Sequence, residues 1–340
     1  MRIASLSNQL IILTLILFGL YVGKDLLIPF IIAVVVWYLL NSLADIFGRM
    51  RLGKRVLPRT IQLLLAFALL IGASFFLIEM ILLNYEFFIE QYPAYHANFI
   101  QLTASWSQKL DLTLLDLDYA SSINIPALLA DAIDSSLGFV TTFFLILLYV
   151  VFLLLEQQIF RSKLKQIFKD RSEYLRFLKI VKRIDESIYS YVSIKTALCL
   201  LSGFLSYWVM FMIGIDFAIL WAFLIFMLNF IPIIGALIGV LFPSLIALLQ
   251  FGSYGEPVLV FSLLASIQLI VGNFVEPKVL GTRLNVSPLV VILALTFWGA
   301  IWGVAGMFLC VPITVILMII LSQFEKTRSI AVLFSAGKVV

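Results

Sequence analysis

The chain has 340 residues, of which 63% are hydrophobic and only 12% are charged, and its formal net charge is +4. Soluble domains are about 45–50% apolar and about 25% charged, so this composition excludes a soluble globular protein. The apolar segments are long and continuous, which favours membrane-spanning helices over the alternating strands of a barrel. We therefore predict an all-α fold: a polytopic helical membrane protein with about eight hydrophobic segments.

Residues that support catalysis or metal binding are scarce. One histidine, His96, and two cysteines, Cys199 and Cys310, lie far apart in the sequence, a pattern that suits neither a metal centre nor a disulfide. The phosphate-binding string G-x-x-x-x-G-K-[ST] is absent, which argues against ATP hydrolysis. We predict that the chain is not an enzyme, binds no metal or cofactor, and has no nucleic-acid partner.

Four spans are predicted in the first half, because a helix needs about 20 apolar residues to cross the hydrocarbon core of a bilayer. Three of them form an N-terminal region, 1–83, and the fourth occupies 135–155. No small-residue cleavage site follows the first apolar run, so we interpret it as a retained helix and not as a signal peptide.

The segment between the third and fourth spans, 84–134, is polar and acid-rich, and Lys109 is its only lysine or arginine. Cytoplasmic loops carry an excess of lysine and arginine, so we predict that 84–134 is an external, periplasmic helical insert. Pro93 and Pro126 predict breaks between short helices within it.

The segment 156–195 is strongly basic, and its apolar residues recur at helical spacing. This pattern predicts basic amphipathic helices that lie on an anionic membrane surface or pack on the protein's own cytoplasmic side. Both alternatives place the segment in the cytoplasm. Together with a second basic stretch at 49–59, it predicts that both chain termini are cytoplasmic, including a tail at 322–340.

A C-terminal transport core is predicted at 196–321. Two of its apolar segments, 217–250 and 288–321, are too long for one straight helix and contain glycine and proline. Each is a tilted helix, a kinked helix or a hairpin, and hydropathy does not separate these alternatives. We predict broken or re-entrant helices in this half of the chain.

Several glycines in these segments are spaced for close helix packing. Gly235 pairs with Gly239, and Gly299 pairs with Gly303, at the G-x-x-x-G spacing that lets two helices approach closely in a membrane. The helix-packing residues that we predict are Gly239, Gly299, Gly303 and Gly306.

Glu276 is the most informative ionisable residue in an apolar segment. It follows Asn273 by three residues, so an α-helix would place both side chains on one face, and the adjacent Pro277 frees backbone carbonyls. A carboxylate beside free carbonyls can bind a cation, exchange protons or accept hydrogen bonds from a polyhydroxylated solute. Buried charges in membranes are costly and mark solute or ion pathways.

A matching break lies in the segment 217–250, where Asn229 precedes Pro232 by three residues and Gly235 follows. The pair of breaks suggests a shared central site, in the manner of discontinuous transporter helices. The substrate or ion path that we predict is formed by Asn229, Pro232, Gly235, Asn273, Glu276, Pro277 and Asp216.

The other ionisable residues at the edges of the apolar segments have simpler interpretations. Asp216 suits the N-cap of the next helix, although it is also a candidate for proton exchange. Glu156 and Lys195 flank spans, where a solvated interfacial position is favoured. Glu79 lies near the outer end of the third span and is expected to face water.

These breaks also carry a resemblance. The strings LNFIPIIG (228–235), GNFVEPKVLG (272–281) and FWGAIWGVAGM (297–307) resemble the most characteristic segments of the autoinducer-2 exporter (AI-2E) family of bacterial inner-membrane proteins. The strings IPF (28–30) and SIAVLFS (329–335) are similar to the quorum-sensing-signal exporter branch. The resemblance implies a multi-span permease that forms a homo-oligomer, for which a pentamer is one candidate.

Family members are associated with export of the furanosyl signal autoinducer-2, and other branches with Na⁺(Li⁺)/H⁺ antiport. Our first hypothesis is therefore an inner-membrane permease that exports a small polar metabolite, such as autoinducer-2, without ATP. The alternative is a Na⁺(Li⁺)/H⁺ antiporter that uses Glu276 or Asp216. A second alternative is a non-transporting membrane scaffold that binds partners through 156–195.

Overall fold

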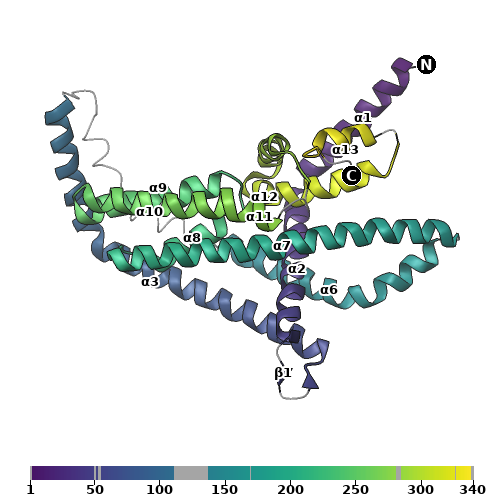
Figure 1. Ribbon diagram of the computed structural model, residues 1–340, viewed down its shortest axis with the longest axis horizontal. Helices are drawn as coiled ribbons and strands as arrows, with labels where there is room; N and C mark the ends of the chain where they lie inside the picture. Colours follow the sequence, from purple (N-terminus) through teal and green to yellow (C-terminus); the bar gives the residue numbers. More distant parts are fainter. Residues whose placement is uncertain are drawn as a thin grey trace. The chain divides into compact units, whose positions relative to one another are not determined.

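The computed structural model describes residues 2–49, 51–52, 55–110, 137–168, 170–280, 285–325 and 327–337. These residues are almost entirely helical (Figure 1), apart from a two-residue antiparallel pair formed by β1 (Arg51–Leu52) and β2 (Arg55–Val56). The prediction of an all-α polytopic membrane protein is confirmed. The helices are α1 (Arg2–Val22), α2 (Lys24–Arg49), α3 (Arg59–Leu110), α6 (Leu137–Ile167), α7 (Arg171–Ile213), α8 (Ala218–Leu228), α9 (Ile234–Phe251), α10 (Gly255–Leu269), η1 (Ile270–Val275), α11 (Glu276–Leu280), α12 (Pro288–Ser322) and α13 (Arg328–Phe334).

Helices long and apolar enough to cross a membrane are found throughout the described part of the chain. Six meet both criteria, and two shorter apolar helices accompany them. The six are Lys24–Arg49, Arg59–Ala104, Arg171–Ile213, Ile234–Phe251, Gly255–Val279 and Pro288–Ser322, and the shorter two are Thr141–Gln157 and Ala218–Leu228.

Helix α3 continues far beyond the predicted third span. Its 52 residues extend about 78 Å at 1.5 Å per residue, whereas the hydrocarbon core is about 30 Å thick. Pro93 lies inside this helix, so the expectation that it separates short helices is wrong. Contacts beyond the proline offset its lost backbone bond, because Tyr95 and Asn98 both bond to other elements. Pro126 lies outside the described residues.

The basic segment 156–195 does not form helices of its own, separate from the apolar spans. It comprises the end of α6 and the start of α7, and each of these helices continues without interruption into an apolar part of the chain. At the turn between them, the backbone N–H and hydroxyl of Ser172 both donate to the carboxylate of Asp170, at 2.9 and 2.8 Å. These two hydrogen bonds hold the pKa of Asp170 below its usual range, and they fix the start of α7.

The long segment 217–250 is a helical hairpin. Its first arm, α8, has only 11 residues, too few to cross a bilayer, and its second arm is α9. The chain reverses at 229–233, where Ile233 has a φ of 67°. A Cβ atom on Gly235 would lie 2.0 Å from the carbonyl oxygen of Leu228, so only glycine allows the two arms to meet this closely.

The segment 288–321 is also broken. Gly303 interrupts α12 with φ 63° and ψ −142°. Residues other than glycine rarely adopt this backbone conformation. The chain then folds back, because a Cβ atom on Gly306 would lie 1.9 Å from the carbonyl oxygen of Trp298. Gly299 lies against Met307, with an added Cβ 3.0 Å from two of its side-chain atoms. Gly303 is therefore a turn residue, and Gly299 and Gly306 are close-contact residues.

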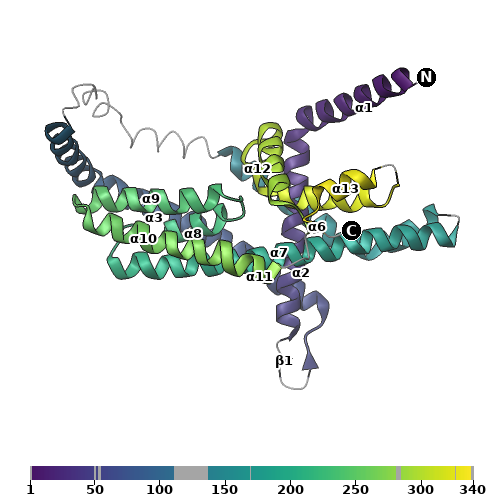
Figure 2. The same ribbon diagram turned by 45° about the horizontal axis from the view of Figure 1, so that its top comes forward.

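The chain divides into two compact units. One comprises 1–63, 139–193 and 282–340, and within it Tyr38 and Tyr189 donate hydrogen bonds to Asp185 and Asp45, between α2 and α7. The other comprises 64–138 and 194–281 and contains α8, α9 and α10 together with parts of α3 and α7. In this second unit α9 and α10 run side by side in both views (Figures 1 and 2). Its core is formed by Met210, Ile215, Ala222, Ile225, Val240, Ala247, Val260 and Leu264.

We predict that Gly235→Ala is strongly destabilising. Its methyl group would overlap the carbonyl oxygen of Leu228, and overpacking of this kind costs about 1–3 kcal/mol or more. Gly72→Ala is the matched control, because an added Cβ at that α3 position meets nothing within 4 Å and alanine favours helix by about 0.5–1 kcal/mol. Thermal unfolding in detergent should show a lower midpoint for Gly235→Ala only. Equal midpoints for the two variants would contradict this packing.

Candidate transport path

A buried polar stripe runs along one face of α7. Lys195, Cys199, Ser202 and Ser206 follow one another at spacings of four, three and four residues, which places them on the same side of a helix. All four are buried, with exposed fractions of 6%, 2%, 0% and 0%. Polar side chains turned inward within an apolar helix are the pattern expected of a solute or ion pathway. We call these four residues the α7 stripe.

The stripe begins at a buried ion pair. Nζ of Lys195 lies 2.6 Å from Oε1 of Glu276, and the two side chains are 7% and 27% exposed. The expectation that Lys195 is solvated is therefore wrong. Its partner lies 81 residues further along the chain, so no local pattern in the sequence could have revealed the pair.

A π-helical turn places Glu276 against α7. The turn is η1, and the N–H of Glu276 donates to the carbonyl of Val271, five residues earlier. Pro277 has no N–H to continue the ordinary helical pattern. Turns of this kind are rare and are often found at functional sites. Here the turn brings a carboxylate to Lys195.

The π turn also separates Glu276 from Asn273. A π turn contains more residues than an α turn, so side chains three residues apart no longer share a face. Glu276 is partly buried and paired, whereas Asn273 and Pro277 are exposed. The expectation that Asn273 and Glu276 lie on one face is wrong.

The first break meets the stripe at a second point. Nδ2 of Asn229 donates to Oγ of Ser202 at 2.9 Å. Asn229 is at the C-terminal end of α8, and its N–H donates to the carbonyl of Ile225. Pro232, partly buried, lies in the reversal that follows. The polar side chains of the two breaks thus contact α7 seven residues apart, at Lys195 and Ser202, which is about 10 Å along the helix.

Three buried polar atoms in this unit have no hydrogen-bond partner among the described residues. They are Oγ of Ser206, Nε1 of Trp221 and Nε2 of Gln268. An unpaired buried polar group costs about 1–3 kcal/mol, so such groups call for an explanation such as a bound water or ligand. Gly239 lies nearby, where an added Cβ would be 3.8 Å from Nε2 of Gln268 and 3.0 Å from Cγ1 of Ile225.

Asp216 has a different environment. Its carboxylate accepts a 2.7 Å hydrogen bond from the hydroxyl of Tyr95 on α3. Its N–H donates to Oε1 of Gln250, whose Nε2 donates to the carbonyl of Gly214. The residue that precedes α8 is Phe217, at a φ of 61° and without a side-chain cap. The N-cap expectation for Asp216 is therefore wrong, and its contacts join α3, the α7–α8 loop and the end of α9.

Two further acidic residues that the sequence singles out lie outside the stripe. Glu156 is paired with Lys163 at 2.5 Å, with both side chains about half exposed, and Glu79 is exposed. Of the residues predicted for the path, Asn229 and Glu276 contact the α7 stripe, whereas the sequence analysis does not single out Ser202 or Ser206 and gives Lys195 an interfacial position. The spacing of these three along α7 was the available signal.

Comparison with known proteins identifies the family. The model of the family described as "AI-2E family transporter" matches residues 10–326. The chain belongs to the AI-2E transporter family. Among its relatives is the AI-2 transport protein TqsA of Escherichia coli K12, 28% identical over 329 residues, which cover 95% of this chain and 93% of TqsA.

Two other relatives are named in general terms as transport proteins. One, from Borreliella burgdorferi, is 32% identical over 255 residues, which cover 74% of this chain and 70% of that protein. The other is YhhT of Escherichia coli K12, 26% identical over 332 residues, which cover 96% of this chain and 93% of YhhT. The family and these names place the chain among multi-pass membrane transporters of bacteria, and they indicate transport and not catalysis.

We predict that the Lys195–Glu276 pair stabilises the fold. Removing one partner of a buried pair costs about 3–5 kcal/mol. Because Glu276 is 27% exposed, we expect Glu276→Gln to lower the free energy of unfolding by about 2–3 kcal/mol. The double variant Lys195→Met with Glu276→Leu should recover most of that loss, because neither charge is left unpaired.

Lys163→Met is the matched control, because its pair with Glu156 is exposed and exposed pairs contribute about 0–1 kcal/mol. Chemical unfolding in detergent micelles measures the free energy of unfolding of the wild-type protein, Glu276→Gln, the double variant and Lys163→Met. If Glu276→Gln and Lys163→Met lose the same stability, the Lys195–Glu276 pair is not buried as described.

Proposed function

We propose that this chain is a secondary transporter of the bacterial inner membrane that moves a small polar solute along the α7 stripe without ATP hydrolysis. One observation supports this most strongly. Two of the helix breaks in the C-terminal half present a polar side chain to the same face of α7, Asn229 to Ser202 and Glu276 to Lys195. Discontinuous helices that meet at polar residues are the usual construction of a transporter site.

The chemistry of the stripe and of the two side chains that contact it favours a solute with several hydroxyl groups. Ser202 and Asn229 supply neutral donors and acceptors, and Lys195 and Glu276 supply one charge of each sign. A polyol can exchange hydrogen bonds with all of these without carrying a net charge into the membrane. Autoinducer-2 is such a solute, and the relative TqsA is named as its transport protein. We propose autoinducer-2, or a metabolite like it, as the exported substrate.

The breaks would also provide the movement. The α8–α9 reversal and the π turn replace the regular backbone hydrogen bonds of a continuous α-helix with other pairings, and we propose that they change shape at lower cost. For solute to pass, the Lys195–Glu276 and Asn229–Ser202 contacts must open and re-form. Alternating access then requires these side chains to exchange their hydrogen bonds with one another for hydrogen bonds with the solute.

A second candidate function is Na⁺(Li⁺)/H⁺ antiport. The observation that favours it is the partly buried carboxylate of Glu276 in the second unit, because such a group can exchange a proton for a cation. In the structure this carboxylate is paired with Lys195, so a sodium ion would have to displace the ammonium group. Asp216 is occupied by Tyr95 in a similar way. These pairings favour the polar-solute hypothesis over antiport.

The scaffold alternative has weaker support, because the relatives are named for transport. We propose that both termini and the 156–195 segment are cytoplasmic and that the 84–134 segment is periplasmic, because lysine and arginine concentrate in cytoplasmic loops. Impermeant labelling of a single cysteine introduced near either end of the chain tests this topology. Labelling from the outer face of intact cells would contradict cytoplasmic termini.

We also propose a homo-oligomer, with a pentamer as one candidate, on the basis of the family resemblance. Light scattering of protein extracted in several mild detergents measures the mass of the complex against the 38.4 kDa chain. We expect a multiple of that mass. A monomer in every detergent would contradict the proposal.

The transport proposal predicts a specific loss of flux in Ser202→Ala and Asn229→Ala. Ser202→Ala removes a hydrogen-bonding group from the stripe, and Asn229→Ala removes its partner on α8; each loss corresponds to about tenfold in rate. Ser262→Ala is the matched control, because Ser262 is exposed on α10 and bonds only to its own helix. The assay uses purified protein in sealed liposomes with a gradient of autoinducer-2, and it measures the autoinducer-2 that enters the liposomes; a pH-sensitive dye inside reports proton movement separately. Unchanged flux in both stripe variants would contradict the path.

The same liposomes separate the two candidate functions. A sodium gradient that moves protons in the wild-type protein, and fails to do so in Glu276→Gln, would establish antiport and exclude the neutral-solute mechanism. Autoinducer-2 flux above that of empty liposomes, with no proton response to sodium, is the result that we expect.

A further inference from the structure

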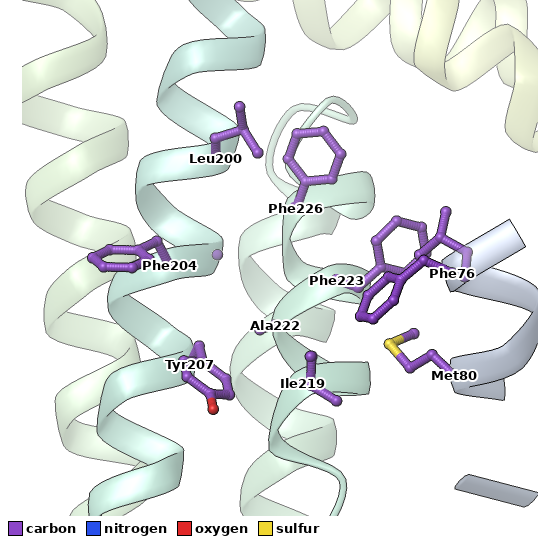
Figure 3. Close-up of a pocket in the computed structure, with 11 residues that line it drawn as sticks. Phe76, Met80, Leu200, Phe204, Tyr207, Ile219, Ala222, Phe223 and Phe226 are labelled. Atoms are coloured by element: carbon purple, nitrogen blue, oxygen red, sulfur yellow. The ribbon is translucent and has the colours of Figure 1, made fainter. Parts of the chain in front are cut away.

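An apolar pocket of about 280 Å³ lies in the second unit, between α3, α7 and α8 (Figure 3). Phe76 and Met80 approach it from α3, Leu200 and Phe204 from α7, and Phe226 from α8. It is distinct from the α7 stripe, because none of the four stripe residues lines it.

The pocket borders a point where α7 and α8 make close contact. A Cβ atom on Gly203 would lie 2.8 Å from the carbonyl oxygen of Ala222 and 3.2 Å from Cβ of Phe226. The absence of a side chain at Gly203 therefore lets α8 pack directly on the backbone of α7. Gly203 and Ala222, the smallest lining residues, leave a recess between this helix pair and α3.

The lining excludes a polar occupant. Tyr207 is the only lining residue with a polar side chain, and the others are aliphatic, aromatic or thioether groups (Figure 3). A polar solute would lose hydrogen bonds to water there without replacing them. Apolar cavities of about 150 Å³ stay dry and accept benzene, so a recess of this size has room for a longer hydrocarbon.

We propose that this pocket is a binding site for one acyl chain of a membrane phospholipid. Its rim is continuous with the surface that faces lipid, because Phe76, Leu200 and Phe204 are 54%, 55% and 60% exposed on helices that cross the membrane. Exposed apolar side chains at this depth contact hydrocarbon and not water. The pocket therefore opens into the lipid, where acyl chains are the most abundant apolar ligand.

Tyr207 gives the bound chain a direction. It lies six residues before the end of α7, about 9 Å along the helix. Tyrosine is enriched near the ends of membrane-spanning helices, at the membrane–water interface. Its hydroxyl has no hydrogen-bond partner within the described part of the chain, and it can donate to an ester carbonyl of the lipid. In Figure 3, Tyr207 lies at one end of the pocket and Leu200 and Phe226 lie at the other. The ester group would sit at Tyr207, with the tail directed towards Leu200 and Phe226.

The test uses full-length protein in nanodiscs that contain a phosphatidylglycerol with a photoreactive diazirine near the end of one acyl chain. After illumination, mass spectrometry locates the labelled residues. We expect labelling of the pocket residues to exceed severalfold that of Phe75 and Leu237, which are 69% and 57% exposed but lie outside the pocket. Equal labelling at all of these positions would reduce the pocket to ordinary lipid contact and overturn the proposal.

Variants that fill the pocket give a second measurement. Ile219→Trp adds bulk from α8 and should remove most of the pocket labelling, whereas Leu237→Trp, an equally large change on exposed α9 surface, should leave it unchanged. Leu200→Trp replaces Ile219→Trp if the latter fails to fold, as judged by gel filtration and thermal unfolding. Pocket labelling that survives both filling variants would contradict the proposal. Cross-links between two protein copies through the pocket residues would overturn it, because a second subunit would then cover the site.

Discussion

The need to pair charges inside a membrane organises the second unit of this protein. An unpaired charged lysine or glutamate in hydrocarbon is costly. Lys195 and Glu276 avoid this by forming an ion pair, with 2.6 Å between Nζ and Oε1. The pair depends on a local distortion of the chain. Pro277 and the π turn at Ile270–Val275 direct the carboxylate of Glu276 towards α7, although the surrounding sequence is apolar. Without that turn, Lys195 would be buried with no partner.

Close backbone contacts complete the arrangement. Gly235 allows α8 and α9 to form a tight hairpin, which holds Asn229 at the end of α8 beside Ser202. Gly203 allows α8 to rest directly on α7. The α7 stripe and the apolar pocket beside α7 thus depend on the same packing. Glycines allow the helices to approach closely, and the polar side chains of α7 face the neighbouring helices. A lipid chain in the pocket would press on the helix that carries the stripe.

Much of this could be predicted from the sequence. Composition predicts a helical membrane protein, and the strings around Asn229, Pro232 and Glu276 locate the two helix breaks that contact α7. The breaks can be predicted because proline interrupts the backbone hydrogen bonds of a helix and because a polar residue beside it in an apolar segment needs a partner. Hydropathy could not separate a kink from a hairpin, because both have the same average. The positive φ values of Ile233 and Gly303 and the close contact at Gly235 appear only in three dimensions.

Long-range partners were the other limit. The local sequence predicts an interfacial position for Lys195, because the carboxylate that pairs with it, on Glu276, is 81 residues away. Asp216 suited a helix cap because its real partner, Tyr95, belongs to a distant helix. Asn273 was placed beside Glu276 on the assumption of α-helical geometry, which the π turn replaces. In each case the local sequence was compatible with a simpler contact, and tertiary packing supplied a different one.

The claim that the α7 stripe lines a water-accessible path is tested most directly by cysteine accessibility along this helix. Single cysteines at positions 195 to 208, in a background where Cys199 and Cys310 are serine, would be treated with a small polar thiol reagent in sealed membranes. We predict reaction at 199, 202 and 206 and protection at Phe204 and Trp208, which face away from the stripe. Reaction on the Phe204 face with protection along the stripe would show that the polar residues are packed shut and that solute passes elsewhere.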